Sequence, residues 1–181
     1  RDDVAEVRRA LRRPAARGLA AAATLIGEVR RETKNLLLVD CGDTIQGSSL
    51  AGVYQTEWRA DAAAAPGPMM LAMSRMGYDA MVVGNHEFNY GLEKLSAARA
   101  GARFPWLSAN TETGGSVPPF APYLLKTVDS VKIAVIGITT AAIPQWEKPE
   151  NIRGLSWLAP EEGVRRAREL PLEVRRLFCE E

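Results

Sequence analysis

Two short apolar runs, each ending in a polar loop, set the strongest limit on what this chain can fold into. The first is LLLVD at residues 36–40, and the second is AMVVG at residues 80–84. Short, continuous apolar runs are typical of strands that are buried on both faces, as in parallel sheets. The sequence therefore predicts an α/β domain in which polar loops follow buried strands.

Segments with helical spacing alternate with such runs along the chain. The predicted helices lie at 18–33, 68–77 and 92–101, and the tail from residue 159 is also helical with a break at Pro171. The predicted strands lie at 35–40, 78–84 and 103–110, with loops at 42–52 and 111–122. Residues 123–139 predict a β-hairpin that turns near Asp129 and Ser130. A hairpin after parallel strands predicts a mixed sheet flanked by helices.

Composition and charge narrow the class of protein. The chain has 181 residues, of which 46% are hydrophobic and 25% are charged, so we expect one globular domain over residues 1–181. The polar, Arg-rich residues 1–17 are expected to be an N-terminal extension of it. The 23 basic residues balance 22 acidic ones, which argues against a polymeric nucleic acid as partner. No apolar run is long enough to predict a membrane span.

Polar side chains follow the first two predicted strands at the point where each strand ends. Asp43 comes after the first, and Asn85 and His86 come after the second. Because the carboxyl ends of strands in an open α/β sheet face one crevice, these side chains are expected to meet. Carboxylate and amide oxygens suit hard divalent metals, and imidazole suits borderline ones. The pattern therefore predicts a metal site at this end of the sheet.

Several motifs in this order resemble the calcineurin-like metallophosphoesterase superfamily, within it the 5′-nucleotidase family and its 2′,3′-cyclic-nucleotide 2′-phosphodiesterase/3′-nucleotidase branch. The motifs are GDTIQGSSL (42–50), YDA (78–80), GNHEFNYGL (84–92), SAN (108–110) and IGITTAAIPQWEKPENIRGL (136–155). The resemblance covers roughly residues 18–170. It implies a layered metallophosphoesterase fold that hydrolyses nucleotide phosphoesters with two divalent metal ions, for which Mn, Zn or Fe would be suitable.

The resemblance also implies roles for four residues. Asp43 would bridge the two metals, and Asn85 would ligate one of them. His86 would face the substrate phosphate, where it stabilises charge on the phosphoryl oxygens or protonates the leaving group. Asn89 stands where many 5′-nucleotidases have an Asp that orients the catalytic histidine, and an Asn fits the cyclic-phosphodiesterase branch. Small nucleotide substrates and a periplasmic or cell-surface location are further implications.

The family pattern is incomplete in this chain. The Asp-x-His pair expected before the first helix is absent, as is the later Gly-His-x-His, and His86 is the only histidine. A dinuclear site needs several imidazoles, so about half of its ligands are missing. The sequence therefore predicts a partial catalytic domain.

Alternatives stay open beside this interpretation. The chain could be a non-catalytic or degenerate fragment, or an unrelated α/β nucleotide-binding domain in which residues 42–47 cradle a phosphate without a Walker lysine. Asn85 could be a helix cap, and Trp146 could stack on a base or belong to a core or lid. Cys41 is expected to be a small buried residue rather than a nucleophile, and Glu87 a structural one.

Overall fold

The computed structural model of the chain describes residues 18–57 and 67–168. Contacts divide the chain into two units, residues 1–36 and 37–181. In the first unit, helix α2 spans Leu19–Glu32, which confirms the prediction for this segment. The predicted extension at residues 1–17 lies outside the described residues, and the single domain over residues 1–181 stays a prediction.

The second unit contains a parallel sheet with the strand order β1-β2-β3. Its strands are β1 (Val39–Asp40), β2 (Ala80–Val82) and β3 (Trp106–Leu107). These strands are shorter than predicted. For β1, a hydrogen bond just before its first residue explains the difference. Leu38 donates its N–H to the side-chain carboxylate of Asp79 at 2.8 Å, so a side chain replaces a backbone rung of the ladder.

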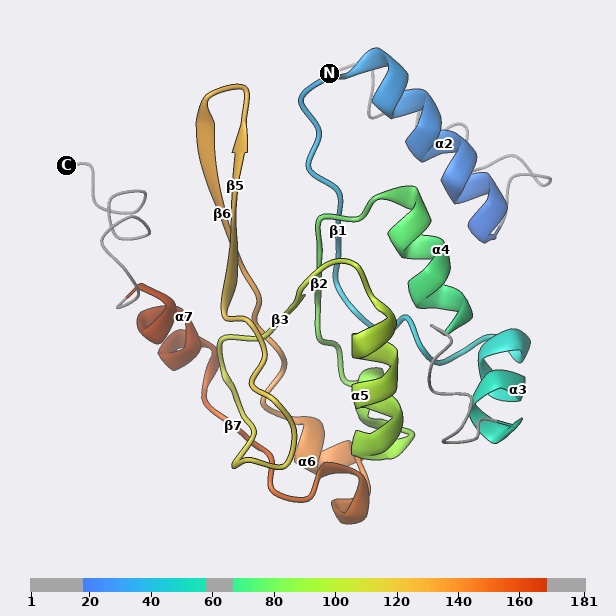
Figure 1. Ribbon diagram of the computed structural model, residues 1–181. Helices are drawn as coiled ribbons and strands as arrows, with labels where there is room; N and C mark the ends of the chain where they lie inside the picture. The colour runs from blue at the N-terminus through green and yellow to red at the C-terminus, as the bar shows by residue number, and fades with distance from the viewer. Residues whose placement is uncertain (1–17, 58–66, 169–181) are drawn as a thin grey trace. The chain divides into compact units, whose positions relative to one another are not determined.

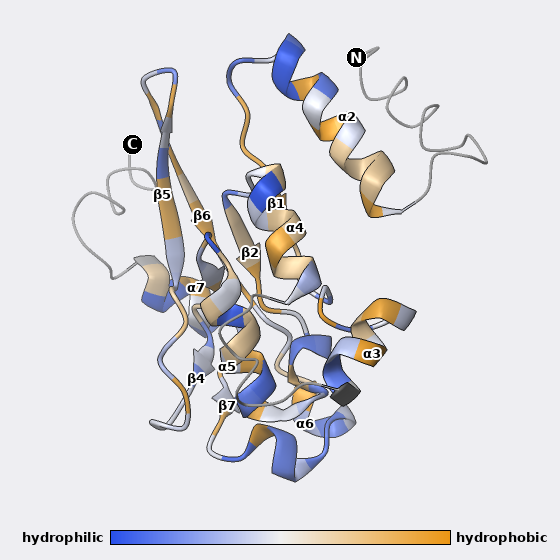
Figure 2. Ribbon diagram, turned by 45° about the vertical axis from the view of Figure 1, so that its right-hand side comes forward, coloured by the Kyte–Doolittle hydropathy of each residue, from blue (hydrophilic) through white to orange (hydrophobic). Residues whose placement is uncertain are grey.

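Two helices pack beside this sheet (Figure 1). Helix α4 spans Pro68–Met76 and buries Met70 and Met73, and helix α5 spans Gly91–Gly101 and buries Leu95 and Ala98. Gly77 ends α4 in the left-handed conformation, with φ of 74°, as expected for a C-terminal glycine. The buried side chains of both helices join Met81 and Trp106 of the sheet in one hydrophobic core. Figure 2 shows hydrophobic residues along most of α4 and β2.

The predicted β-hairpin is confirmed. Strands β5 (Tyr123–Val128) and β6 (Val131–Ile136) run antiparallel, and Val128 faces Val131 across the turn (Figure 1). Asp129 and Ser130 have positive φ values of 47° and 67°. Two such residues in a two-residue turn match the twist of the strands that they join.

Parallel and antiparallel pairing both occur, as predicted, but they are distributed over three sheets. The hairpin is linked to β3 by an isolated parallel bridge between Leu107 and Ala121. A third sheet pairs β4 (Thr111–Glu112) with β7 (Ser156–Trp157). The loop prediction for 111–122 was therefore wrong at β4, because this short strand is defined by a partner distant in the sequence.

Short helices complete the second unit. They are α3 (Ser49–Glu57), η2 (His86–Phe88), α6 (Ile143–Trp146), η3 (Pro149–Ile152) and α7 (Pro160–Arg168). The start of α3 contradicts the predicted loop at 42–52, where glycines and serines obscure the helical pattern. Helix α7 confirms the start of the helical tail, whereas the break at Pro171 lies outside the described residues. No described helix is both long and apolar enough to cross a membrane.

Candidate active site

The loops that follow β1 and β2 meet at two glycines. A Cβ atom on Gly42 would lie 2.7 Å from the Cα atom of Gly84, and one on Gly84 would lie 2.7 Å from the backbone nitrogen of Asp43. Both distances are far below van der Waals contact, so side chains at these positions would push the loops apart. The two motifs predicted to form the site are therefore in backbone contact.

Glu87 ties the two loops together. Its Oε2 atom accepts hydrogen bonds from the backbone N–H groups of Asp43 and Gly84, both at 2.8 Å, and its Oε1 atom accepts one from Thr44 at 2.7 Å. The side chain is fully buried. Burial raises the pKa of the Glu87 carboxyl, and the three backbone donors partly oppose that rise. These contacts confirm the structural role expected for this residue.

Asp43 is held in an unusual backbone conformation next to His86. Its φ is 62°, in the left-handed region that Asp tolerates better than most residues with a side chain. Its Oδ1 atom accepts a hydrogen bond from the backbone N–H of His86 at 3.0 Å. The carboxylate is exposed, so it remains accessible while its loop is fixed.

Asp40 is a second carboxylate at this end of the sheet, and it was not among the predicted site residues. It is the last residue of β1 and accepts a hydrogen bond from the N–H of Gly42 at 2.8 Å. Burial raises the pKa of Asp40, the hydrogen bond from Gly42 lowers it, and the nearby charge of Asp43 raises it further. Its position directly after an apolar run was the signal that could have identified it.

A chain of polar side chains extends from the ring of His86. The Nδ1 atom lies 2.6 Å from Oδ1 of Asn89, and the amide nitrogen of Asn89 donates to Oε2 of Glu147. Asn151 donates to Oε1 of Glu147 at 2.9 Å and to the backbone oxygen of Asn89 at 3.0 Å. The sequence predicted Asn89 beside His86, whereas Glu147 and Asn151 lie in the motif at 136–155 but were not predicted to be site residues.

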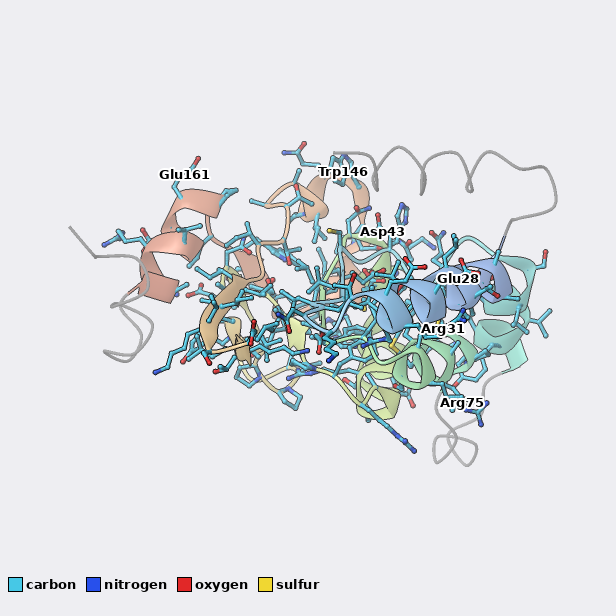
Figure 3. The ribbon with its side chains drawn as sticks, turned by 90° about the horizontal axis from the view of Figure 1, so that it is seen from above. Glu28, Arg31, Asp43, Arg75, Trp146 and Glu161 are labelled. Carbon is cyan, nitrogen blue, oxygen red and sulfur yellow. The ribbon has the colours of Figure 1, made fainter. Side chains whose placement is uncertain are left out.

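Exposure and bonding bear on three structural alternatives for the other candidates, namely a helix cap, a buried cysteine and a core tryptophan. Asn85 precedes η2 but makes no side-chain capping hydrogen bond, so its amide is not used as a helix cap. Cys41 is exposed, which contradicts the expected burial because it lies in the loop just beyond β1. The side chain of Trp146 is 64% exposed and is therefore not part of the core. Figure 3 shows Asp43 and Trp146 on the same side of the ribbon in that view.

Two metal ions would need several oxygen or imidazole donors close together at this site. Asp43 and Asn85 offer oxygen donors of the kind that divalent cations accept. Among residues 18–57 and 67–168, however, no three His, Cys, Asp or Glu side chains gather closely enough to hold a metal ion. The described residues thus do not complete a dinuclear site on their own.

A comparison with protein families decides the assignment. The model of the calcineurin-like phosphoesterase family matches residues 15–171. The chain belongs to this family. Calcineurin-like phosphoesterases use divalent metals, and the resemblance inferred from the motifs is confirmed.

Curated relatives of this calcineurin-like phosphoesterase chain are nucleotide hydrolases. The trifunctional nucleotide phosphoesterase protein YfkN of Bacillus subtilis is 38% identical over 149 residues, which cover 76% of this chain and 10% of that protein. A 2′,3′-cyclic-nucleotide 2′-phosphodiesterase/3′-nucleotidase of Salmonella typhimurium is 38% identical over 147 residues, which cover 76% of this chain and 22% of that protein. The chain thus spans less than a quarter of the length of these two relatives.

Solved structures of the family confirm the fold. The calcineurin-like phosphoesterase YfkN of Bacillus subtilis has a TM-score of 0.73 at 31% identity, covering 93% of this chain and 53% of that chain. The 5′-nucleotidase precursor of Thermus thermophilus has a TM-score of 0.70 at 30% identity, covering 91% of this chain and 30% of that chain. The predicted layered metallophosphoesterase-like fold is therefore confirmed.

Proposed function

We propose that this chain supplies part of the active site of a metal-dependent phosphoesterase that hydrolyses 2′,3′-cyclic nucleotides or nucleoside monophosphates. One observation carries the proposal. The carboxylate of Asp43 accepts a hydrogen bond from the backbone of His86, so the two family motifs are in direct contact. The names of the relatives support nucleotides as the substrate class.

Asp43 and Asn85 are the proposed metal-binding residues. Their oxygens would contribute to the binding of two divalent ions such as Mn, Zn or Fe, with further ligands from outside the described residues. The ions would supply positive charge next to the phosphoryl group. Asp43 suits this role because its loop is fixed by Glu87 while its carboxylate remains exposed.

His86 is the proposed catalytic residue, and Asn89 supports it. The Nδ1 atom of His86 is engaged by Asn89, whereas its Nε2 atom makes no hydrogen bond with the described residues. Nε2 would therefore be the ring nitrogen that stabilises charge on the phosphoryl oxygens or gives a proton to the leaving oxygen. The family resemblance adds the proposal of a periplasmic or cell-surface location.

The test of this proposal is the exchange Asp43→Asn in a longer chain. Residues 18–168 would replace the matching segment of the Bacillus YfkN domain, so that ligands missing from the described residues are restored. We expect hydrolysis of 2′,3′-cyclic AMP with manganese, loss of that activity with excess chelator, and its abolition by Asp43→Asn. The assay measures the released nucleoside monophosphate.

Asp129→Asn is the matched control. Asp129 also has a positive φ, of 47°, but lies in the turn of the hairpin, so the same chemical change is made in a similar backbone conformation. We expect full activity in this variant. Equal activity in Asp43→Asn and in the control would reject the proposed role of Asp43.

A role as a non-catalytic module is the second candidate function, because the described residues contain no cluster of three metal-binding side chains. A folded longer chain that hydrolyses no nucleotide under these conditions would favour it. The metal-free phosphate cradle at residues 42–47 is disfavoured, since the N–H groups of Asp43 and Thr44 already donate to Glu87. Nucleotide binding in the presence of chelator would be expected only for that cradle.

A further inference from the structure

We propose that Glu147 is a positioning residue that holds the ring of His86 in the Nδ1–H tautomer by orienting the side-chain amide of Asn89. The catalytic meaning of this inference rests on the proposed function. The tautomer of His86, and its dependence on Glu147, can be measured without a substrate or a metal ion.

The contact path joins segments that are far apart in sequence. His86 and Asn89 belong to the turn around η2, and Glu147 directly follows α6. The His86 Nδ1 atom lies 2.6 Å from Oδ1 of Asn89, while the amide nitrogen of Asn89 donates to Glu147. The carboxylate therefore reaches the ring through one amide group.

An asparagine alone cannot select a histidine tautomer. The two ends of its amide have nearly the same shape, but the oxygen accepts hydrogen bonds and the nitrogen donates them. An ionised carboxylate only accepts, so the nitrogen of Asn89 must face Glu147 and its oxygen must face His86. The ring can then satisfy that oxygen only by donating from Nδ1.

Glu147 is itself held in place and kept ionised. Its Oε1 atom accepts hydrogen bonds from the backbone N–H of Lys148 at 2.8 Å and from the amide of Asn151 at 2.9 Å. Partial burial raises the pKa of Glu147, but the hydrogen bonds from Lys148, Asn151 and Asn89 outweigh that effect, and the pKa lies below its ordinary value. The carboxylate is therefore an acceptor at neutral pH.

The consequence concerns the other ring nitrogen. With the proton on Nδ1, the neutral ring carries its lone pair on Nε2, which makes no hydrogen bond with the described residues. Only in the doubly protonated ring does Nε2 carry the proton that its proposed role at the phosphoryl group needs, and Nδ1 keeps its hydrogen bond to Asn89 there. In the opposite tautomer Nε2 would already carry a proton in the neutral ring.

The test uses the fact that the chain contains a single histidine. With ¹⁵N-labelled histidine, the long-range ¹H–¹⁵N spectrum of the neutral ring shows one residue and reports its tautomer directly. We expect Nδ1–H as the dominant form in the unmodified chain. In Glu147→Gln the amide of Asn89 loses its fixed orientation, and the ring signals are expected to shift toward the Nε2–H form that the side chain of free histidine prefers.

Two further variants make the result specific. Asn89→Asp combined with Glu147→Gln places an acceptor beside the ring in either orientation, and it should restore the Nδ1–H form. Glu150→Gln removes the same charge from an exposed residue three positions along the chain, and it should leave the spectrum unchanged. A dominant Nδ1–H form in folded Glu147→Gln, or an equal shift in Glu150→Gln, would overturn the proposal.

Glu147→Asp covers the case in which Glu147→Gln does not fold. It keeps the charge but shortens the side chain, so its carboxylate no longer reaches Asn89, and the same loss of Nδ1–H is expected. Retention of the Nδ1–H form in this variant would overturn the proposal as well.

Activity measurements separate this inference from the proposed function. In the longer hydrolysing chain, Glu147→Gln should lower kcat by about tenfold to a hundredfold with little change in KM, and the double variant should recover part of it. Absence of hydrolysis in every chain, together with the expected tautomer shifts, would reject the proposed function and support the positioning role. Hydrolysis unaffected by Glu147→Gln, with an unchanged spectrum, would reject the positioning role alone.

Discussion

At the scale of single residues, the site depends on two glycines that leave room for its loops to meet. Gly42 and Gly84 have no Cβ, and this allows the loops after β1 and β2 to touch. Gly42 also has a φ of 90°, which disfavours any other residue. Asp43 follows it with a positive φ of its own, so two consecutive residues with positive φ place one carboxylate, and only Asp43 has a conformation that is unfavourable for its side chain.

Gly42→Ala should therefore destabilise the protein more than a strained backbone alone would. Gly47 is the matched control, because it has a φ of 102° and its added Cβ would meet nothing within 4 Å. We expect Gly47→Ala to cost about 1–2 kcal/mol of unfolding free energy from the backbone conformation. Gly42→Ala should cost about 3 kcal/mol or more, because overlap with Gly84 is added. Urea unfolding measures both, and equal losses would contradict the close contact.

Glu87→Gln tests how the two loops are held. The amide of Gln has one acceptor oxygen where Glu87 uses two, so at least one of three partly buried N–H groups would lose its partner. We expect the free energy of unfolding to fall by about 1–3 kcal/mol. Glu93→Gln, on the exposed face of α5, should change it by less than about 0.5 kcal/mol. A similar small effect at Glu87 in chemical unfolding would show that the carboxylate does not tie the loops.

At the scale of elements, some helices and strands could be predicted from the local sequence, whereas others depend on partners that are distant in the sequence. Helices α2, α4 and α5 and the hairpin were predictable because each carries its own periodicity or turn residues. The pairing of β4 with β7 was not, since two-residue strands have no pattern that is visible locally. Burial of Cys41 was predicted wrongly because the residue lies in the exposed loop just beyond β1, which its neighbouring apolar run does not reveal.

The residues of the candidate site divide in the same way, into those that the sequence could indicate and those that only the fold brings together. Asp43, Asn85, His86 and Asn89 could be proposed from their positions after apolar runs and from the family resemblance. Glu147 could not, because it reaches Asn89 across 58 positions of sequence and only the packing of α6 brings it there. Asn110 is a similar case, since its buried amide bonds Thr139 and Leu158 and joins three segments of the fold.

Glu147, which directly follows α6, is expected to make the stability of the protein depend on pH. The pKa of Glu147 in the folded chain lies below its ordinary value of 4.5, so the ionised carboxylate contributes stability above that pH. As the pH falls through the lowered pKa, the folded chain also takes up the proton and the contribution is lost. The difference in unfolding free energy between the unmodified chain and Glu147→Gln should therefore be largest near pH 7.

Urea unfolding of both chains between about pH 7 and pH 3 checks this prediction. The difference should shrink below about pH 4.5 if the carboxylate accepts its hydrogen bonds only when ionised. A difference that stays constant over the whole range would contradict the lowered pKa.

At the scale of the whole molecule, the main feature is how much of the site the described residues provide. They hold the carboxylates of Asp40 and Asp43 and the side chains of Asn85 and His86, but no group of three metal-binding side chains. Strand β1 lies at the edge of its sheet, and Val39 in it is 41% exposed. The chain also spans less than a quarter of two curated relatives, which is consistent with our proposal that it provides only part of a metal site.

The most direct test of this central claim is the metal content of the purified 181-residue chain after equilibration with manganese and zinc, measured by elemental analysis. We predict well below two ions per chain, because the described donor set is incomplete, and a further decrease in Asp43→Asn, because Asp43 is one of the proposed ligands. Close to two ions per chain, unchanged by Asp43→Asn, would contradict both the incomplete site and the role of Asp43.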